Sequence, residues 1–381
     1  MNKRALFIDL LRALALLVMI EVHVFNEMLS QSFKSGLFYS TLNFINGLVA
    51  PTFLFVSGFV FVLSLQKGAD ELRRFGIKFW KKISRIAIII AGGYSLHTPY
   101  FSIEKLIQNW SPVVENQLFI VDILQCIGAG LLLLLFARII FRNNKSFYNF
   151  IIITLILVIA LSPYFWKIDF TRFLPIHLAS YLNPSTGSLF PVFPWFNFLF
   201  TGALFSKFYI SYRNKEKEER FAVISLLMGI VFFTSGWVSL DLLPSYDIDI
   251  IRPHPLFYLE RLGAVLFLLG ICWFYVNWRK NYHSFMLDVS RESLLIYWFH
   301  LQIIYRKFFG GISLTTIYGN KLDIFWTAMM TVAISILMIN FAKGWGWLKT
   351  NHPPLSKKLV IAFLSICVIV FIINGIFLIN V

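Results

Sequence analysis

Apolar residues fill about eleven long stretches of this chain, and polar residues gather between the stretches. A helix needs about 20 mostly apolar residues to cross a bilayer, and most of the stretches reach that length, although 83–97 and 292–309 are shorter. The pattern predicts an all-α, polytopic membrane protein with about eleven transmembrane helices. The predicted spans cover residues 5–26, 38–66, 83–97, 118–137, 148–165, 190–210, 221–240, 257–278, 292–309, 323–343 and 358–378.

The loops between the predicted spans differ in charge, and this difference predicts the topology. Lys and Arg residues crowd into every second loop, such as 67–82 and 207–220, whereas loops such as 98–117 and 163–189 contain few of them. Because loops rich in Lys and Arg stay in the cytoplasm, we expect a cytoplasmic N-terminus and an external C-terminus. Only the loop around 310–322 departs from this alternation. The predicted location is the cell (inner) membrane, crossed many times.

Composition supports this interpretation and explains the net charge. Of the 381 residues, 58% are hydrophobic and 14% are charged, and no stretch leaves room for a sizeable soluble appendage. These values are typical of membrane proteins, so we expect a single membrane domain over residues 1–381. The net charge of +15 follows from the basic cytoplasmic loops. We therefore expect membrane lipids, and no nucleic acid, as partners.

The first predicted span carries charged residues that a bilayer tolerates poorly. A charge inside a spanning helix costs several kcal/mol, so it usually has a function or a partner. At about 100° per residue, most of the polar residues of this span fall on one helix face, and Glu21 points elsewhere. This polar stripe consists of Asp9, Arg12, His23, Asn26 and Glu27.

The predicted topology gathers further polar residues near the outer side of the membrane. They come from several different spans, and such a cluster is typical of a ligand-binding or catalytic site. They are His97, Asp122, Gln125, Trp195, Glu260, Arg261, Tyr297 and His300.

The residues of the first span each have a functional and a structural interpretation. His23 is the best candidate for a general base, because imidazole titrates near neutral pH, and Glu27 one turn later would orient it. Alternatively, His23 is a structural histidine satisfied by a neighbouring helix. Arg12 either binds an anionic ligand or extends to the cytoplasmic headgroups. We expect Asp9 to pair with Arg12, three residues later.

The other candidates leave the same two readings open. His300 and Asp122 are further catalytic candidates. Lys82 and Arg85 form a basic rim that is a candidate to bind ligand phosphates, although this basic rim also serves as a topology signal. The remaining outer residues either bind substrate or have structural roles. The structural alternatives are an interfacial residue for His97, a hydrogen-bond scaffold for Gln125, an interface-belt aromatic for Trp195 and an internal ion pair for Glu260 and Arg261. These substrate-binding candidates are His97, Gln125, Trp195, Glu260, Arg261 and Tyr297.

Several kinds of site lack their minimal sequence parts. The chain contains no GxSxG, HExxH, P-loop or CxxC motif, which argues against serine hydrolases, zinc proteases, ATPases and thiol redox enzymes. Cys126, Cys272 and Cys367 lie singly in apolar stretches, so we expect neither a metal site nor a disulfide framework. What remains is transfer of a group from a phosphorylated donor inside to an acceptor outside.

A set of motifs, taken together, resembles a known family. The motifs are RALFIDLLRALALLVMIEVH, APTFLFVSGF, RISRI…GGYSLH, VDILQCIG, FPVFPWFNFLFTGA and SRESLLIYWFHL, and they extend over nearly the whole chain. In order and spacing they are similar to those of the bacterial relatives of heparan-α-glucosaminide N-acetyltransferase, in the transmembrane acyltransferase superfamily. Arg12 and His23 also match the Arg-x10-His pattern of the related acyltransferase-3 proteins. The chain departs from many relatives in having Ala13 after Arg12 and an unusually acidic segment around His23.

The resemblance implies an integral-membrane acyltransferase with a single transmembrane acyltransferase-like domain. It would move an acetyl or other acyl group from cytosolic acyl-CoA to the amino or hydroxyl group of an external sugar, with Arg12 serving the donor and His23 the transfer step. Acetyl-CoA or another acyl-CoA and a glycan acceptor are then the expected ligands, and a homodimer is compatible with the sequence. The alternatives are a non-enzymatic transporter or flippase for an anionic or lipid-linked sugar, and a scaffold in an envelope complex.

Overall fold

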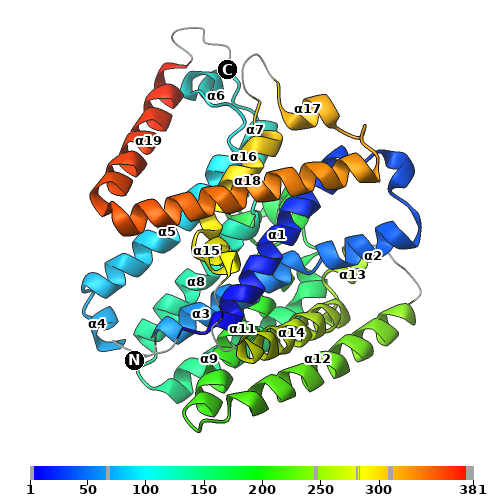
Figure 1. Cartoon of the computed structure of the whole chain (residues 1–381), viewed down its shortest axis with the longest axis vertical. Helices are drawn as coiled ribbons and strands as arrows, with labels where there is room; N and C mark the ends of the chain where they lie inside the picture. Colours follow the sequence, from blue (N-terminus) through cyan, green and yellow to red (C-terminus); the bar gives the residue numbers. More distant parts are fainter. Residues whose placement is uncertain are drawn as a thin grey trace. The chain divides into compact units, whose positions relative to one another are not determined.

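The computed structural model describes residues 4–65, 69–243, 248–279, 282, 284–307 and 312–374, most of which form α-helices (Figure 1). Each predicted apolar stretch coincides with one or two of the longer helices. These are α1 (Leu6–Met28), α2 (Gly36–Asn46), α3 (Val49–Leu65), α5 (Ile77–His97), α8 (Ile123–Ile140), α9 (Asn144–Phe165), α11 (Val192–Arg213), α12 (Glu218–Asp241), α14 (Pro255–Trp278), α16 (Ser293–Tyr305), α18 (Ile324–Asn351) and α19 (Pro353–Ile373).

Shorter helices occupy the connections between these elements. The α-helical ones are α4 (Ala69–Arg73), α6 (Ile103–Gln108), α7 (Pro112–Leu118), α10 (Ile176–Ala179), α13 (Ile248–Ile251), α15 (Phe285–Arg291) and α17 (Leu314–Tyr318). Three 3-10 turns join them, η1 (Gln31–Phe33), η2 (Phe170–Arg172) and η3 (Pro184–Thr186). The structure thus confirms the all-α prediction for the described part of the chain.

Seven helical segments in the described ranges are long and apolar enough to cross a membrane. They are Gly36–Leu65, which joins α2 and α3, together with α8, α9, α12, α14, α18 and α19. Helices α1, α5 and α11 have 23, 21 and 22 residues but are not among the seven. A multi-pass membrane protein is therefore supported, whereas the number of about eleven spans and the sides of the two termini stay predictions. The last predicted span reaches residue 378, and residues 375–381 lie outside the described residues.

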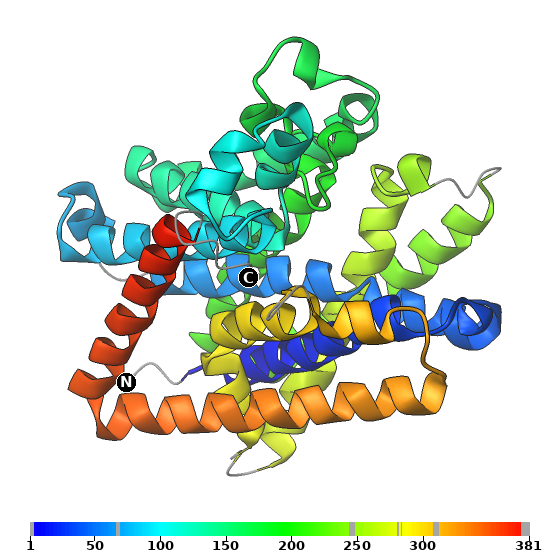
Figure 2. The ribbon, with the colours of Figure 1, turned by 90° about the horizontal axis from the view of Figure 1, so that it is seen from above.

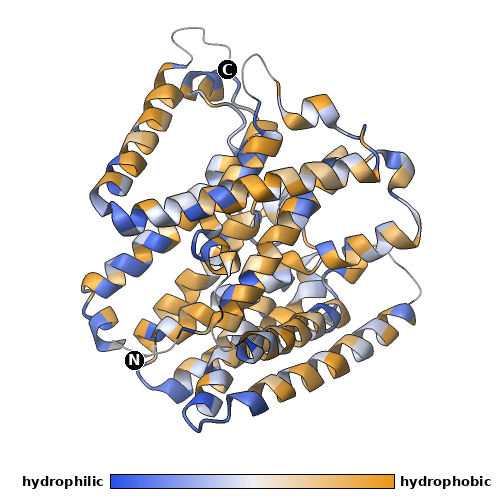
Figure 3. Cartoon of the chain, in the orientation of Figure 1, coloured by the Kyte–Doolittle hydropathy of each residue, from blue (hydrophilic) through white to orange (hydrophobic). Residues whose placement is uncertain are grey.

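The exposed faces of the long helices are apolar, as a lipid environment requires. Hydropathy colouring shows apolar residues along most of the helical surface and polar residues mainly at helix ends and in connections (Figure 3). Almost none of α19 is buried, and its apolar residues Ile361 and Ile366 are 64% and 60% exposed. Soluble proteins rarely expose continuous apolar faces of this kind. Lipid tails would cover them.

The described helices divide into two compact units, and each unit is assembled from separate segments of the chain. The first consists of residues up to Leu11, Ala50–Ser95 and Phe119–Tyr282. The second consists of Arg12–Val49, Leu96–Leu118 and the chain from His283 onwards. Helix α1 thus contributes its first turns to one unit and its remainder, from Arg12, to the other. The single domain expected over residues 1–381 stays a prediction.

Glycines let the helices of the first unit approach closely. Helices α12 and α14 lie side by side (Figure 1), and a Cβ atom at Gly229 or Gly263 would run into the backbone of the opposite helix. Helices α3 and α11 cross in the same way, because Gly58 faces the Leu199 carbonyl and Gly202 faces the Phe55 carbonyl. Small residues at such crossings allow extensive van der Waals packing between membrane helices, where no hydrophobic force drives their association.

In the second unit, the long helix α18 is followed by a sharp bend into α19 (Figure 2). His352 has a non-helical backbone, and Pro353 occupies the first position of α19, where the absence of an N–H group is harmless. Near the end of α18, Lys349 pairs with the buried Glu292 at 2.5 Å. Glu292 separates α15 from α16, so this ion pair ties α18 to the start of α16.

Candidate active site

Helix α1 carries the polar stripe, and its carboxyl end is fixed by a distant loop of the second unit. The backbone N–H of Asn320 donates to the carbonyl of Glu27 at 2.8 Å, and those of Lys321 and Leu322 donate to the carbonyl of Met28 at 3.1 and 2.9 Å. These bonds satisfy carbonyls that a helix leaves without partners in its last turn. The backbone from which Glu27 projects is therefore held in place.

The hydroxyl of Tyr305, at the end of α16, lies between the two candidate acid–base residues of α1. It is 3.0 Å from Nδ1 of His23 and 3.4 Å from Oε1 of Glu27. His23 and Glu27 are half-buried, and the rings of His23 and Tyr305 meet edge to face with centroids 5.7 Å apart. Because the carboxylate can only accept, the Tyr305 O–H donates to Glu27 and the His23 Nδ1–H donates to the Tyr305 oxygen. In this arrangement the basic lone pair of His23 is on Nε2.

A second histidine completes the cluster from α16. His300 is fully buried, and its ring centroid is 5.3 Å from that of His23. Its Nδ1–H donates to the Ile296 carbonyl at 2.8 Å, so its lone pair is on Nε2, which has no hydrogen-bond partner among the described residues. The ring of Tyr297 contacts that of His300 with centroids 5.8 Å apart. A buried acceptor without a donor is costly, and such groups often mark a site where a ligand binds.

The other residues of α1 have different surroundings. Asp9 is buried and accepts hydrogen bonds from Arg4, five residues earlier, including one of 2.9 Å from Nη2. The expected pairing of Asp9 with Arg12 stays a prediction. Arg12 is half-buried and Asn26 is exposed. Glu21, as predicted, points away from the stripe, where its carboxylate contacts the amide of Asn46 on α2.

Among the substrate-binding candidates, Glu260 and Arg261 are paired in the first unit, 3.5 Å apart. The Arg261 guanidinium lies 5.4 Å from the ring centroid of Phe257, and the ring of Trp195 contacts the same ring at 6.2 Å. Trp195 follows the cis peptide bond between Phe193 and Pro194, near the start of α11. The indole of Trp195 and the guanidinium of Arg261 thus share one aromatic neighbour, and Glu260 and Arg261 form the ion pair that their structural interpretation expects.

Asp122 and Gln125 lie at the start of α8, also in the first unit. The Asp122 carboxylate accepts from the N–H of Ile123 at 2.7 Å and caps the helix, whereas the predicted span 118–137 placed this residue inside the helix. The side chain of Gln125 is fully buried against Gly93, and its Nε2 donates to the Ile120 carbonyl at 3.3 Å. His97 is the last residue of α5, is half-buried and belongs to the second unit.

The two basic-rim residues differ in their contacts. Nζ of Lys82 donates to the Ser64 hydroxyl at 2.7 Å and lies 4.8 Å from the centre of the Phe61 ring, so it is engaged with α3. Arg85 is exposed and lines a surface pocket. No group of three or more His, Cys, Asp or Glu residues in the described part of the chain could hold a metal ion.

Tyr305 is the member of the cluster that sequence reasoning did not find. It lies eight residues after Tyr297 in a span rich in aromatic residues, and nothing in that pattern distinguishes its hydroxyl from any other. The polar stripe of α1 does require polar partners from another helix, and this requirement is the signal that could have directed a search for hydroxyls near the ends of neighbouring spans.

Comparison with known proteins places this chain in a family. The family described as "Heparan-alpha-glucosaminide N-acetyltransferase, catalytic" matches residues 4–239, which is more than half of the 381 residues. The matched part includes His23 and Glu27, whereas Tyr305 and His300 lie beyond its end. No curated protein matches the chain.

Proposed function

Because this chain belongs to the heparan-α-glucosaminide N-acetyltransferase family, we propose that it transfers an acetyl or other acyl group from cytosolic acyl-CoA to the amino or hydroxyl group of an external sugar. The observation that carries this proposal is the hydrogen-bonded series of His23, Tyr305 and Glu27 beside the buried His300. It supplies an imidazole that a carboxylate would orient through a hydroxyl. A transporter needs polar residues along its path, but it does not need such a base.

His23 is the general base of the proposed reaction. Its Nε2 takes the proton of the acceptor N–H or O–H as the acceptor atom attacks the thioester carbonyl, and a new C–N or C–O bond forms while the C–S bond breaks. The imidazolium then returns the proton to the departing sulfur, so that the enzyme ends in its starting state. In the imidazolium state, Nδ1–H still donates to Tyr305, and Tyr305 donates to the Glu27 carboxylate, which stabilises the positive charge.

His300 is proposed to orient the acceptor. Its ring centroid lies 5.3 Å from that of His23, and its Nε2 lone pair can accept a hydrogen bond from a second N–H or O–H of a sugar. Sugars offer adjacent donors of this kind, and matching a buried acceptor with a substrate donor yields strong discrimination. Tyr297, whose ring contacts that of His300, is proposed to contact the same acceptor.

Arg12 is proposed to bind the phosphates of the donor. It lies on the same helix as His23, eleven residues earlier, which corresponds to about 16 Å along the axis. A donor with a phosphorylated head and a long arm spans such a distance. With the N-terminus in the cytoplasm, Arg12 would lie on the cytosolic side and His23 nearer the outside. The remaining candidates, proposed to contact donor or acceptor, are Lys82, His97, Asp122, Gln125, Trp195, Glu260 and Arg261.

The test is acyl transfer by the purified full-length chain in lipid nanodiscs, with acetyl-CoA as donor and a panel of amino sugars and glycans as acceptors. CoA thiol release and acetylated product are measured together. His23→Ala should lower the rate by about 10²–10⁴-fold, the usual contribution of a general base. The matched control is His177→Ala, because His177 is exposed, belongs to the first unit and has no proposed role.

Donor binding provides a second measurement that is independent of the acceptor. Acetyl-CoA should raise the thermal unfolding midpoint of the wild type and of His23→Ala, but not that of Arg12→Ala. Full activity of His23→Ala would refute the assignment of the base. Stabilisation by a lipid-linked sugar in the absence of any effect of acetyl-CoA would instead support a transporter or flippase.

A further inference from the structure

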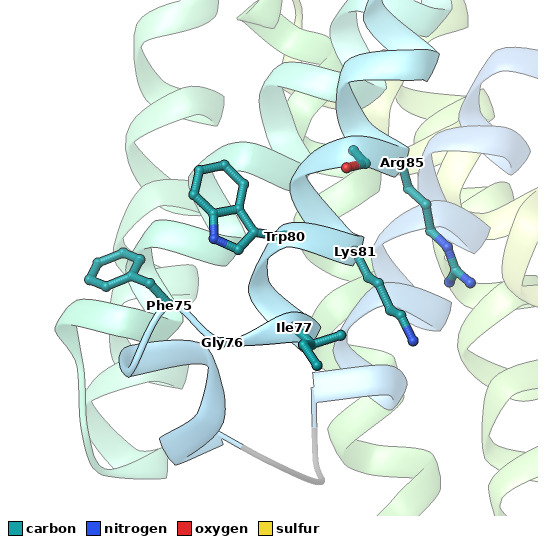
Figure 4. Close-up of a pocket in the computed structure, with 7 residues that line it drawn as sticks. Phe75, Gly76, Ile77, Trp80, Lys81 and Arg85 are labelled. Atoms are coloured by element: carbon teal, nitrogen blue, oxygen red, sulfur yellow. The ribbon is translucent and has the colours of Figure 1, made fainter.

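A surface pocket of about 710 Å³ lies where α4 turns into α5, in the first unit. It is lined by Phe75, Gly76, Ile77, Trp80, Lys81, Ser84 and Arg85. Figure 4 looks into it: Phe75 and Trp80 border one side, and the side chains of Lys81 and Arg85 project on the other. The pocket therefore has an aromatic side and a cationic side.

The apolar wall of this pocket is strongly exposed. Phe75 is 54%, Ile77 70% and Trp80 60% exposed, and Ile88, further along α5, is 59% exposed. Positions 77, 80, 84 and 88 fall on one side of a helix, so this apolar face continues from the pocket along α5. In a multi-pass membrane protein, a face of this kind contacts acyl chains, and Trp is typical of its boundary with the headgroups.

The charges of the pocket complement an anion. The two acidic residues of α4 are already paired, Asp70 with Arg73 at 2.9 Å and Glu71 with Lys78 at 2.5 Å. Lys81 and Arg85 lie on successive turns, are exposed and have no ion-pair partner among the described residues. The Ser84 hydroxyl lies next to them in the sequence and lines the same pocket. Two cations and a hydroxyl match a phosphate group.

We propose that this pocket binds an anionic phospholipid of the cytoplasmic leaflet, with its phosphate at Lys81, Ser84 and Arg85 and its acyl chains along Ile77, Trp80 and Ile88. Basic pockets on the cytoplasmic side of membrane proteins bind anionic headgroups in this way, and the predicted topology puts this end of α5 in the cytoplasm. A nucleotide phosphate shares the charge, but it has no chains to cover the apolar face that extends beyond the pocket. The pocket belongs to the first unit, whereas His23 belongs to the second.

Native mass spectrometry of the full-length chain can test the proposal. The chain is reconstituted with phosphatidylcholine alone or with added phosphatidylglycerol, and bound lipids are counted after mild detergent extraction. The wild type should retain phosphatidylglycerol selectively. In Lys81→Gln/Arg85→Gln its affinity should fall roughly 30-fold, since each cation near the surface contributes about fivefold. Trp80→Ala should weaken retention without changing the net charge.

The matched control is Arg142→Gln/Lys145→Gln, which removes two exposed charges from another loop that is predicted to be cytoplasmic. It should retain phosphatidylglycerol as the wild type does. Equal retention in the Lys81/Arg85 variant would overturn the proposal. So would displacement of the lipid by CoA, which would assign the pocket to a nucleotide, or by glycerol phosphate, which would make it a site for free phosphate. Acetyl transfer by the Lys81/Arg85 variant is measured in parallel, so that failure of this proposal is distinguishable from failure of the proposed function.

Discussion

At the scale of single residues, the hydroxyl of Tyr305 decides how the candidate site works. The spacing of His23 and Glu27 predicts that the carboxylate orients the imidazole directly. In the structure the Tyr305 hydroxyl lies between the two residues, 3.0 Å from His23 Nδ1 and 3.4 Å from Glu27 Oε1. Glu27 is therefore placed to act on His23 through Tyr305. We therefore propose that Tyr305 positions His23, and the order of these bonds leads to two predictions.

Replacing Tyr305 by Phe removes the hydroxyl and keeps the ring. We expect kcat to fall roughly tenfold, because one hydrogen bond that orients the base contributes about 1–1.5 kcal/mol, while acetyl-CoA binding stays unchanged. Steady-state kinetics and a thermal-shift titration measure the two quantities. Tyr318→Phe, a half-buried tyrosine of the same unit, is the control and should leave both unchanged. A weaker binding of acetyl-CoA to Tyr305→Phe would show a general structural role.

Glu27→Gln tests whether the carboxylate acts through the tyrosine. On the wild-type background we expect a several-fold loss of kcat, because a neutral amide stabilises the imidazolium less than a carboxylate does. On the Tyr305→Phe background the same substitution should have little further effect, because residues that act in series are not additive. A double-mutant cycle on kcat measures this coupling. Fully multiplicative losses would mean that Glu27 acts on His23 by another route.

At the scale of elements, close helix crossings hold the first unit together. Gly58 and Gly202 bring α3 and α11 so close that each glycine faces a carbonyl of the other helix. The close approach buries Phe55, Phe59 and Phe198 at the centre of this unit. The candidate residues Trp195 and Glu260 depend on this packing, because α11 carries Trp195 and α14, which contacts α11, carries Glu260.

Gly202→Ala should destabilise the protein by about 1–3 kcal/mol, the usual cost of overpacking, because a methyl group would collide with the Phe55 carbonyl. The unfolding midpoint in a mild detergent measures this effect. Gly344→Ala on α18 is the control, because no atom lies within 4 Å of the added methyl group. It should leave the midpoint unchanged or raise it slightly, since Ala favours a helix more than Gly. Equal midpoints for the two variants would contradict the close crossing.

At the scale of the whole molecule, charge along the chain sets the orientation in the membrane. The connections rich in Lys and Arg, such as 138–147, are predicted to be cytoplasmic, and those such as 163–189 are predicted to be external. The proposed path of the acyl group, from a cytosolic donor to an external acceptor, depends on this orientation. The helices of the structure do not choose between the two orientations, because both have the same contacts.

Cysteine labelling in intact cells tests the orientation. Phe173→Cys lies in a predicted external connection and is 76% exposed in the native chain, whereas Lys145→Cys lies in a predicted cytoplasmic one and is also exposed. A membrane-impermeant maleimide should label the first in intact cells and the second only after permeabilisation. The unsubstituted chain controls for Cys367, while Cys126 and Cys272 are buried. The opposite pattern would invert the topology and place His23 nearer the cytoplasm.

The sequence by itself determined the helices, because hydrophobic periodicity and the cost of exposing a backbone in lipid act within one segment of chain. Each predicted stretch coincides with helical structure, and His23 and Glu27 could be assigned to one face of α1 from their spacing of four residues. Similarity of motifs also led to the family.

Only the tertiary structure decided which helices meet. The contact of Tyr305 with His23 joins residues 282 positions apart, and the pairing of His23 with His300 depends on how α16 packs against α1. Hydrophobicity is much the same on every face of α16, so it does not specify which side of that helix meets α1. Helix pairing is set instead by side-chain shape and by a few buried hydrogen bonds, and these appear only when the chain is folded.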